Sequence, residues 1–185
     1  LGRAEEALSS GQKAAELAPS LAAGWYLRGR ALIALRRPEE AHESLERSLS
    51  LDPGQGEAWY RDGLALEELG RHREAVASFD RAIAASPKAI GAWYGKGRSL
   101  QALGRGRDPL QAPEKGLAIE PANPEDWFSR GLILEDLGRY GDEVTSLEKT
   151  LRVNPNHGEA WFHRGVALSA LGRTAEAAEA FRETL

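Results

Sequence analysis

The sequence contains no cysteine, no methionine and no excess of positive charge. The lack of cysteine excludes a disulfide framework and a thiolate metal site, and it leaves the redox compartment open. Acidic residues (28) outnumber basic ones (24), and a formal net charge of -4 would repel a nucleic-acid backbone, so no nucleic-acid partner is expected. No stretch approaches the ~20 apolar residues that span a bilayer. We therefore expect no membrane insertion, and the cytoplasm is the favoured compartment.

The tryptophans recur with a fixed period. All five stand 34 residues apart, and each is followed after four residues by a glycine and after seven by a leucine. The tryptophans are Trp25, Trp59, Trp93, Trp127 and Trp161, and the glycines are Gly29, Gly63, Gly97, Gly131 and Gly165. This spacing places the three residues on one helix face. Because a glycine inside a helix costs about 1 kcal/mol against alanine, we expect a second helix to approach closely at each glycine.

That second helix is predicted to follow a tight turn. The tripeptide Leu-Gly-Arg recurs at residues 69–71, 103–105, 137–139 and 171–173, where glycine suits a left-handed helix cap. The next segment carries apolar residues at helical spacing, such as Ala75, Phe79 and Ala82, and it ends before a proline. These prolines keep the same period, at Pro19, Pro53, Pro87, Pro121 and Pro155. Each repeat is therefore predicted to be a helix, a tight turn, a helix and a proline-marked turn.

These features resemble the tetratricopeptide repeat (TPR), whose signature of Trp, Gly, Ala, Phe and Pro is present in GEAWYRDGLALEELGRHREAVASFDRAIAASPKA, residues 56–89. The resemblance implies an all-α fold, a right-handed superhelical solenoid of antiparallel helix-turn-helix repeats that forms a single domain over residues 1–185. We expect a leading half repeat, four full repeats and an incomplete fifth, at 1–21, 22–55, 56–89, 90–123, 124–157 and 158–185. The RNA-reading pentatricopeptide family is disfavoured, because its repeat is normally one residue longer and lacks the Trp and Gly signature.

Two places depart from the family pattern. The usual leucine before the motif glycine is replaced by a charged residue in every repeat, at Arg28, Asp62, Lys96, Arg130 and Arg164. In the third repeat, Pro109, Pro113 and Gly116 stand where the second repeat has Ala75, Phe79 and Ala82. An interior proline costs about 3 kcal/mol in a helix. The sequence therefore predicts an irregular segment to about Ala112 and a short helix after Pro113, in a degenerate repeat or in a functional hinge.

No catalytic constellation is found in the sequence. The four histidines stand at four different repeat positions, and no two have the i, i+4 spacing of a helical metal site, which favours surface histidines. They are His42, His72, His157 and His163. The Gly-Arg-Gly at residues 104–106 lies at a turn between helices rather than after a strand, so it does not match a phosphate-binding loop. We expect no enzymatic activity, no cofactor and no metal.

The expected binding surface is a concave face lined by the first helix of each repeat. A stripe about a third of a turn from the tryptophans carries an aromatic residue directly after each of them, with charged and amide side chains nearby. The predicted partner-binding groove consists of Tyr26, Arg30, Tyr60, Arg61, Glu67, Tyr94, Arg98, Gln101, Phe128, Glu135 and Phe162. Tyrosine and arginine often carry interface energy. The aromatic residues either contact a ligand or partly fill the space between neighbouring repeats.

Two functions remain open. In the first, the domain is a scaffold or adaptor whose groove binds a peptide or helical segment of another protein, expected to be of mixed charge. The family's lysine and asparagine clamp for a C-terminal carboxylate is missing, since all three asparagines lie in turns. In the second, the chain is a self-assembly module that forms homo-oligomers through the solenoid ends, where Ala177, Phe181 and Leu185 are predicted to leave an apolar face uncovered.

Overall fold

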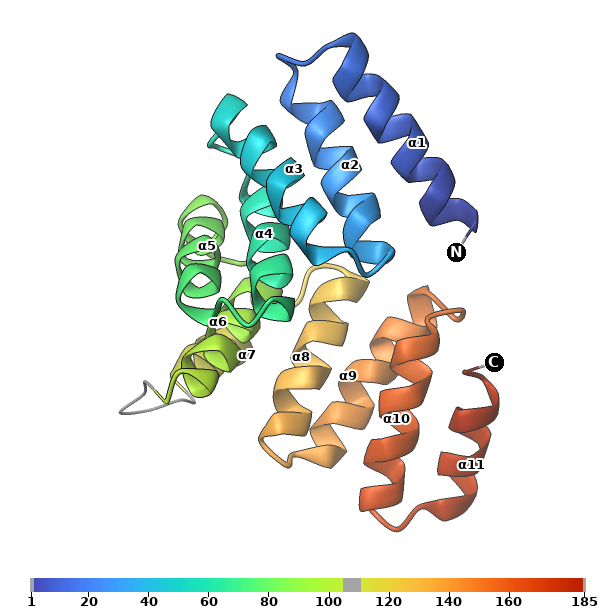
Figure 1. Cartoon of the computed structure of the whole chain (residues 1–185). Helices are drawn as coiled ribbons and strands as arrows, with labels where there is room; N and C mark the ends of the chain where they lie inside the picture. The colour runs from blue at the N-terminus through green and yellow to red at the C-terminus, as the bar shows by residue number, and fades with distance from the viewer. Residues whose placement is uncertain (1, 105–110, 185) are drawn as a thin grey trace. The chain divides into compact units, whose positions relative to one another are not determined.

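The computed structural model describes residues 2–104 and 111–184, and within these it consists of eleven helices without a strand (Figure 1). The expected all-α fold is confirmed. The chain divides into two compact units, Leu1–Ala112 and Pro113–Leu185, and the division falls inside α7 (Gln111–Leu117). The arrangement of the chain as a single domain of numbered repeats stays a prediction.

The first unit is built from helices that pack pairwise along the chain. They are α1 (Gly2–Leu17), α2 (Ala22–Ala34), α3 (Pro38–Leu51), α4 (Gly56–Glu68), α5 (His72–Ala85) and α6 (Ile90–Ala102). Each of these packs against the next, and α4 also contacts α2 and α6. The second unit contains α8 (Pro124–Asp136), α9 (Tyr140–Val153), α10 (Gly158–Ala170) and α11 (Thr174–Arg182). There α10 packs against α9 and α11, and it also contacts α8.

The shared period of tryptophan and proline has a direct structural cause. In four repeats the indole N–H of the tryptophan donates a hydrogen bond to the backbone carbonyl of the proline six residues earlier. The pairs are Trp25 with Pro19 at 3.0 Å, Trp59 with Pro53 at 2.9 Å, Trp93 with Pro87 at 3.0 Å and Trp161 with Pro155 at 2.7 Å. Each bond ties a first helix to the turn that precedes it, so the large ring stays half-buried with its polar atom satisfied.

The motif glycines lie where two helices meet, as predicted. A Cβ atom added at Gly63 would lie 2.6 Å from the Phe79 ring, and one at Gly29 would lie 2.7 Å from Leu45. Gly131 and Gly165 face Leu147 and Phe181 in the same way, at 2.9 and 2.5 Å. Close packing of the second helix therefore offsets the helix-forming cost of these glycines.

The tight turns adopt the left-handed conformation expected of a glycine cap. Gly70, Gly104, Gly138 and Gly172 have φ between 61° and 74°. The turn after α2 carries Arg36 at the corresponding position, with a φ of 58°. A residue with a Cβ atom is strained in this region by roughly 1–2 kcal/mol. Arg36 therefore introduces local backbone strain, which the four turns with glycine avoid.

The short helix α7 corrects one detail of the third repeat. It begins at Gln111, before Pro113, and not after that proline as predicted. Pro113 thus lies in the first turn, where backbone N–H groups have no acceptor within the helix, so the missing proline N–H costs little. The predicted irregular segment, including Pro109, lies largely outside the described residues. Gly116 is buried within α7.

The charged residues that replace the family's leucine cross-link neighbouring helices. Arg28 of α2 donates to Ser44 of α3 at 2.8 Å, and Lys96 of α6 pairs with Asp80 of α5 at 2.6 Å. In the second unit Arg164 of α10 pairs with Glu148 of α9 at 3.2 Å, and Arg130 of α8 donates to the carbonyl of Leu117 at 3.0 Å. A polar bond thus replaces apolar packing at these positions.

Candidate functional site

The predicted aromatic row is mostly built into the packing of each unit. Tyr26 packs against the Leu45, Leu49 and Ala58 cluster, and the Tyr60 ring lies 6.1 Å from the ring of Phe79. In the second unit Phe128 packs against Leu147, Leu151 and Ala160. Tyr94 is also half-buried, whereas Phe162 is 51 % exposed. Tyr26, Tyr60 and Phe128 therefore fill space between helices and present only part of their surface to solvent.

Two predicted groove residues of the first unit form a pair of their own. The Arg98 guanidinium of α6 lies 2.9 Å from the Glu67 carboxylate of α4, and the Ser99 hydroxyl donates to Glu67 at 3.3 Å. Arg98 also stacks on Tyr94, with 5.5 Å between the guanidinium carbon and the ring centroid. Burial raises the pKa of Glu67, against the opposing effects of Arg98 and Ser99, and only 7 % of its side chain is exposed. The Glu67 carboxylate therefore takes part in contacts within the protein, with Arg98 and Ser99.

The other predicted residues of the first unit differ in exposure. Arg61 pairs with Glu57 one turn earlier on α4, at 2.8 Å. Arg30 on α2 and Gln101 on α6 are exposed. Arg98 keeps nearly half of its side chain accessible despite its pair with Glu67. Arg30, Arg98 and Gln101 are thus the accessible polar part of the predicted groove in this unit.

In the second unit the predicted residues gather around a histidine. His163 of α10 donates from Nδ1 to the Glu135 carboxylate of α8 at 2.7 Å. The imidazole centroid lies 5.9 Å from that of Phe128 and 5.5 Å from that of Phe162. Glu143 of α9 completes a group whose ligand atoms all lie within 4.8 Å of one another. Sequence reasoning missed this group, because it compared only histidines along one helix, although Glu143 occupies a position where alanine is usual.

The assignment of the histidines to the surface is wrong for His42 and His157, whose side chains are 12 % and 13 % exposed. His157 precedes α10, and its Nδ1 accepts a hydrogen bond from the Ala160 N–H at 3.3 Å. The polar ring is thus satisfied by capping the helix and is packed 4.6 Å from the Phe128 ring, centroid to centroid. Local hydrogen bonds offset the cost of burying the polar ring.

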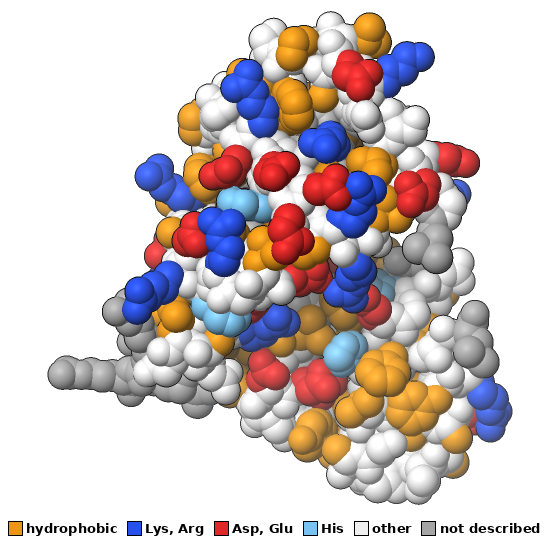
Figure 2. All heavy atoms as spheres, in the orientation of Figure 1, with side chains coloured by type: hydrophobic (Ala, Val, Ile, Leu, Met, Phe, Trp, Pro, Cys, Tyr) orange, Lys and Arg blue, Asp and Glu red, His pale blue; other side chains and the backbone are white. Residues whose placement is uncertain are grey.

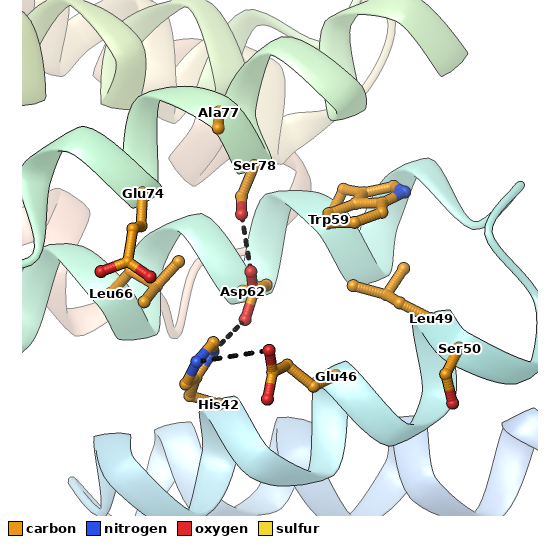
Figure 3. A pocket seen from close by; sticks show the side chains of 10 residues that line it. All are labelled: His42, Glu46, Leu49, Ser50, Trp59, Asp62, Leu66, Glu74, Ala77 and Ser78. Atoms are coloured by element: carbon orange, nitrogen blue, oxygen red, sulfur yellow. Dashed lines mark hydrogen bonds and ion pairs between the residues drawn. The ribbon is translucent and has the colours of Figure 1, made fainter.

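His42 belongs to a hollow of about 410 Å³ between α3, α4 and α5 (Figure 3). His42 donates from Nδ1 to one oxygen of Asp62 at 2.6 Å, and Ser78 donates to the other oxygen at 2.6 Å. Figure 3 shows the two side chains approaching Asp62 from α3 and α5. None of the predicted groove residues lines this hollow.

The group in this hollow differs from a serine-protease triad. There the imidazole lies between serine and aspartate and takes the serine proton. Here the carboxylate of Asp62 lies in the middle, so Ser78 is bonded to an acid and not to a base. The arrangement links three helices through one buried carboxylate, and it has no imidazole in position to activate the serine.

Charge is mixed over the visible surface of the first unit. Figure 2 shows acidic and basic side chains interspersed there, without a large area of one sign. Large apolar side chains are exposed in both units: Leu17, Leu21 and Leu27 in the first, and, on or beside α10 and α11 in the second, Phe162, Leu171 and Phe181. Within the described ranges, no helix combines the length and the apolar character needed to cross a membrane.

Antiparallel helix pairs with a left-handed turn between their helices, joined by proline turns, define a class of helical repeat proteins. The chain belongs to the tetratricopeptide repeat family, whose model matches residues 26–90 and 130–185, together more than half of the sequence. This membership confirms the resemblance seen in the sequence, and it supports a general role in protein interaction. The sequence has no match among the curated proteins.

Several solved structures share the fold. YrrB, a TPR protein with an unusual peptide-binding site, is 20 % identical, with a TM-score of 0.56 over 96 % of this chain and 92 % of its own. MamA from Desulfovibrio magneticus RS-1 is 23 % identical, with a TM-score of 0.53 over 88 % of this chain and 92 % of its own. A chain of the APC/C hetero-tetramer Cut9-Hcn1 is 18 % identical, with a TM-score of 0.76 over all of this chain and 37 % of its own. At these identities the likeness concerns the fold.

Proposed function

We propose that this protein is an adaptor that binds a peptide or a helical segment of another protein through the faces that the first helices form within each unit. The observation that carries the proposal is the ordered and accessible Arg98, which is held by Glu67 and stacked on Tyr94 while part of its guanidinium side chain faces solvent. Preordered arginine and aromatic side chains suit interface anchors, because little side-chain entropy is lost on binding. The peptide-binding site of the related fold YrrB supports the same role.

The proposed partner segment is of mixed charge, and its acidic residues meet Arg30 and Arg98. Glu67 and Glu135 are already paired with Arg98 and His163, so they orient these neighbours and contribute less to binding basic groups. The aromatic residues beside them contribute the exposed edges of their rings. Phe162, the most exposed of the row, is the proposed apolar contact in the second unit.

The test uses surface variants that leave the half-buried tyrosines intact. Arg30→Glu and Gln101→Glu place acids on the proposed face, and Arg47→Glu on α3 is the matched control, because Arg47 is exposed on a second helix. Each protein is checked by circular dichroism and used as bait in a lysate of the source organism, and captured proteins are identified by mass spectrometry. Loss of one captured protein with the two groove variants, and its retention by Arg47→Glu, supports the proposal. Equal capture by all four baits contradicts it.

A second candidate, self-assembly, is favoured by the exposed Phe162, Leu171 and Phe181. The sequence expectation for this face needs a correction, because Ala177 is buried in the core of its own unit and not left uncovered. It packs there against Val144, Ala167 and Leu168, while Leu185 lies outside the described residues. Light scattering over a wide concentration range tests this candidate. A molar mass that grows with concentration in the parent but not in Leu171→Lys supports assembly, and a constant monomer mass contradicts it.

A further inference from the structure

Three side chains that commonly bind metals meet in the second unit, and each comes from a different helix. Glu135 lies on α8, Glu143 on α9 and His163 on α10. One ligand atom from each lies within 4.8 Å of the other two, and His163 Nδ1 is 2.7 Å from a Glu135 oxygen. The three helices are successive in the chain and pack directly on one another. The group therefore exists only when this unit is folded.

Glu143 is the unusual member of the group. Its side chain is 0 % exposed, and neither carboxylate oxygen has a hydrogen-bond partner among the described residues. Burial raises the pKa of Glu143 to about 8, with further contributions from the negative charges of Glu135 and Asp136. An unpaired buried carboxylate is costly, and a positive ion beside it removes much of that cost.

Packing does not require a glutamate at this position. At multiples of 34 residues from Glu143, Ala41, Ala75 and Ala177 are buried alanines, whereas Pro109 of the third repeat lies outside the described residues. Glu67, which stands at the repeat position of Glu135, is paired with Arg98 of the following first helix. In the second unit the corresponding carboxylate of Glu135 instead meets an imidazole and a second carboxylate. Two carboxyl groups thus meet at this place, where the first unit has one carboxylate paired with an arginine.

The histidine of the group is oriented by its surroundings. Its ring is packed beside Phe128 and Phe162, with T-shaped contacts to both. Its Nδ1–H donates to Glu135, because an ionised carboxylate can only accept. A bound metal ion would replace that proton and use the same nitrogen lone pair, as metal ligation by histidine requires.

We propose that Glu135, Glu143 and His163 bind a zinc ion through two carboxylate oxygens and one imidazole nitrogen. The two carboxylates neutralise a dication, and a mixed nitrogen and oxygen set favours zinc over magnesium or calcium, which prefer oxygen alone. Metal–ligand distances of about 2.0–2.1 Å in a tetrahedron put the ligand atoms roughly 3.3 Å apart. The observed separations, from 2.7 Å to at most 4.8 Å, bracket this value, so small side-chain rotations complete the site. The fourth position is open to water or to a group from a partner. This inference stands independently of the proposed groove.

The experiment measures zinc binding by the whole chain after chelation and removal of the chelator. Isothermal titration with zinc chloride gives the stoichiometry and Kd, and thermal unfolding by circular dichroism gives Tm with and without zinc. The variants are Glu143→Ala, which introduces the alanine of the first, second and fifth repeats, and His163→Gln. The matched control is Glu148→Gln, which removes a carboxylate from the same helix outside the group, where Glu148 pairs with Arg164. A parallel titration with magnesium chloride tests whether the site prefers zinc over magnesium.

We expect one zinc ion per chain in the parent and in Glu148→Gln, with a zinc-dependent rise in Tm. Glu143→Ala and His163→Gln weaken binding by at least roughly 10-fold, since even the loss of a supporting contact costs that much. In the absence of metal, Glu143→Ala unfolds at a higher Tm than the parent, because it removes an unpaired buried carboxylate. Absence of saturable zinc binding in the parent overturns the proposal. So does equal affinity in Glu143→Ala, or preference for magnesium.

Discussion

The ring of Phe79 lies against the backbone of Gly63, so closely that a Cβ atom at that glycine would be 2.6 Å from a ring carbon. Gly95, on the following first helix, faces the same ring from another side. Phe79 is fully buried and belongs to the core cluster of the first unit. The contact joins α4, α5 and α6, and it requires a residue without a side chain on both first helices.

Replacement of Gly63 by alanine is expected to lower the free energy of unfolding. The added methyl group must displace a buried ring, and overpacking of this kind costs about 1–3 kcal/mol. This exceeds the gain of up to about 1 kcal/mol in helix propensity. Urea denaturation followed by circular dichroism measures the change. Gly141→Ala is the control, because nothing lies within 4 Å of a Cβ atom there, and it should be neutral or slightly stabilising. An equal effect at both positions would contradict the packing explanation.

A glycine in place of Arg36, in the turn after α2, should stabilise the protein. Arg36→Gly relieves a left-handed conformation that costs an arginine roughly 1–2 kcal/mol, and it removes the Arg36–Glu68 salt bridge of 2.7 Å. That pair is largely exposed and contributes little. We expect a gain of about 1 kcal/mol in the free energy of unfolding. Gly70→Ala, at the corresponding turn with a φ of 71°, should lose a similar amount. A loss of stability in Arg36→Gly would show that the salt bridge outweighs the strain.

The carboxylate of Asp62 should stabilise the first unit through its two partners. Asp62→Ala leaves the His42 N–H and the Ser78 hydroxyl without their acceptor, at a cost of about 1–3 kcal/mol. A double-mutant cycle with Ser78→Ala isolates the shared bond, and residues in direct contact give interaction energies of at least about 0.5 kcal/mol. Additive effects of the two substitutions would mean that the 2.6 Å bond contributes nothing to stability.

The contribution of Glu67 to the free energy of unfolding should decrease as the pH rises. Burial raises its pKa above 4.5 in the folded state, so the folded protein binds this proton more tightly than the unfolded chain. The stabilisation that comes from this tighter proton binding is fully present below pH 4.5. It is lost as the pH rises from there through the folded pKa. Relative to the parent, Glu67→Gln should therefore be more stable at pH 7 than at pH 4. Urea denaturation at a series of pH values measures this difference.

Glu40 offers the opposite case as an internal control. Its hydrogen bonds from Arg37, at 2.7 and 2.8 Å, lower the pKa of its carboxyl below 4.5. A lowered folded pKa stabilises the protein above the unfolded value, and this contribution is lost as the pH falls through the folded value. The free energy of unfolding of Glu40→Gln relative to the parent should thus decrease as the pH rises, whereas that of Glu67→Gln should increase. The same sign for both variants would contradict the assignment of burial as the cause at Glu67.

Much of the fold could be predicted, because the signals that define a helical hairpin lie within one repeat. The period of tryptophan and proline reflects a hydrogen bond across six residues, such as Trp59 to Pro53. The motif glycines mark close packing between consecutive helices, and the turn glycines mark a positive φ. The start of α7 at Gln111 was missed because a proline in the first turn of a helix is tolerated, and the sequence alone did not locate that turn.

Less of the candidate site could be predicted, because the environment of a side chain depends on helices that are distant in sequence. Tyr60 and Phe128 belong to the expected aromatic row, but their burial depends on the residues across from them. Glu67 belongs to the predicted groove, but its hydrogen bond with Arg98, 31 residues further on, could not be predicted from the sequence. The glutamate at position 143, where three other repeats have alanine, was the one signal in the sequence that pointed to an unusual environment.

The sequence by itself determined the repeat, its helices, its turns and its family, because each of these follows from contacts within a few residues or within one hairpin. Only the tertiary structure decided which polar groups meet. Glu135, Glu143 and His163 come from three different helices, and His42, Asp62 and Ser78 come from three others. A helical period specifies the face on which a side chain lies, but the packing of separate helices sets the distance between side chains and the solvent that reaches them.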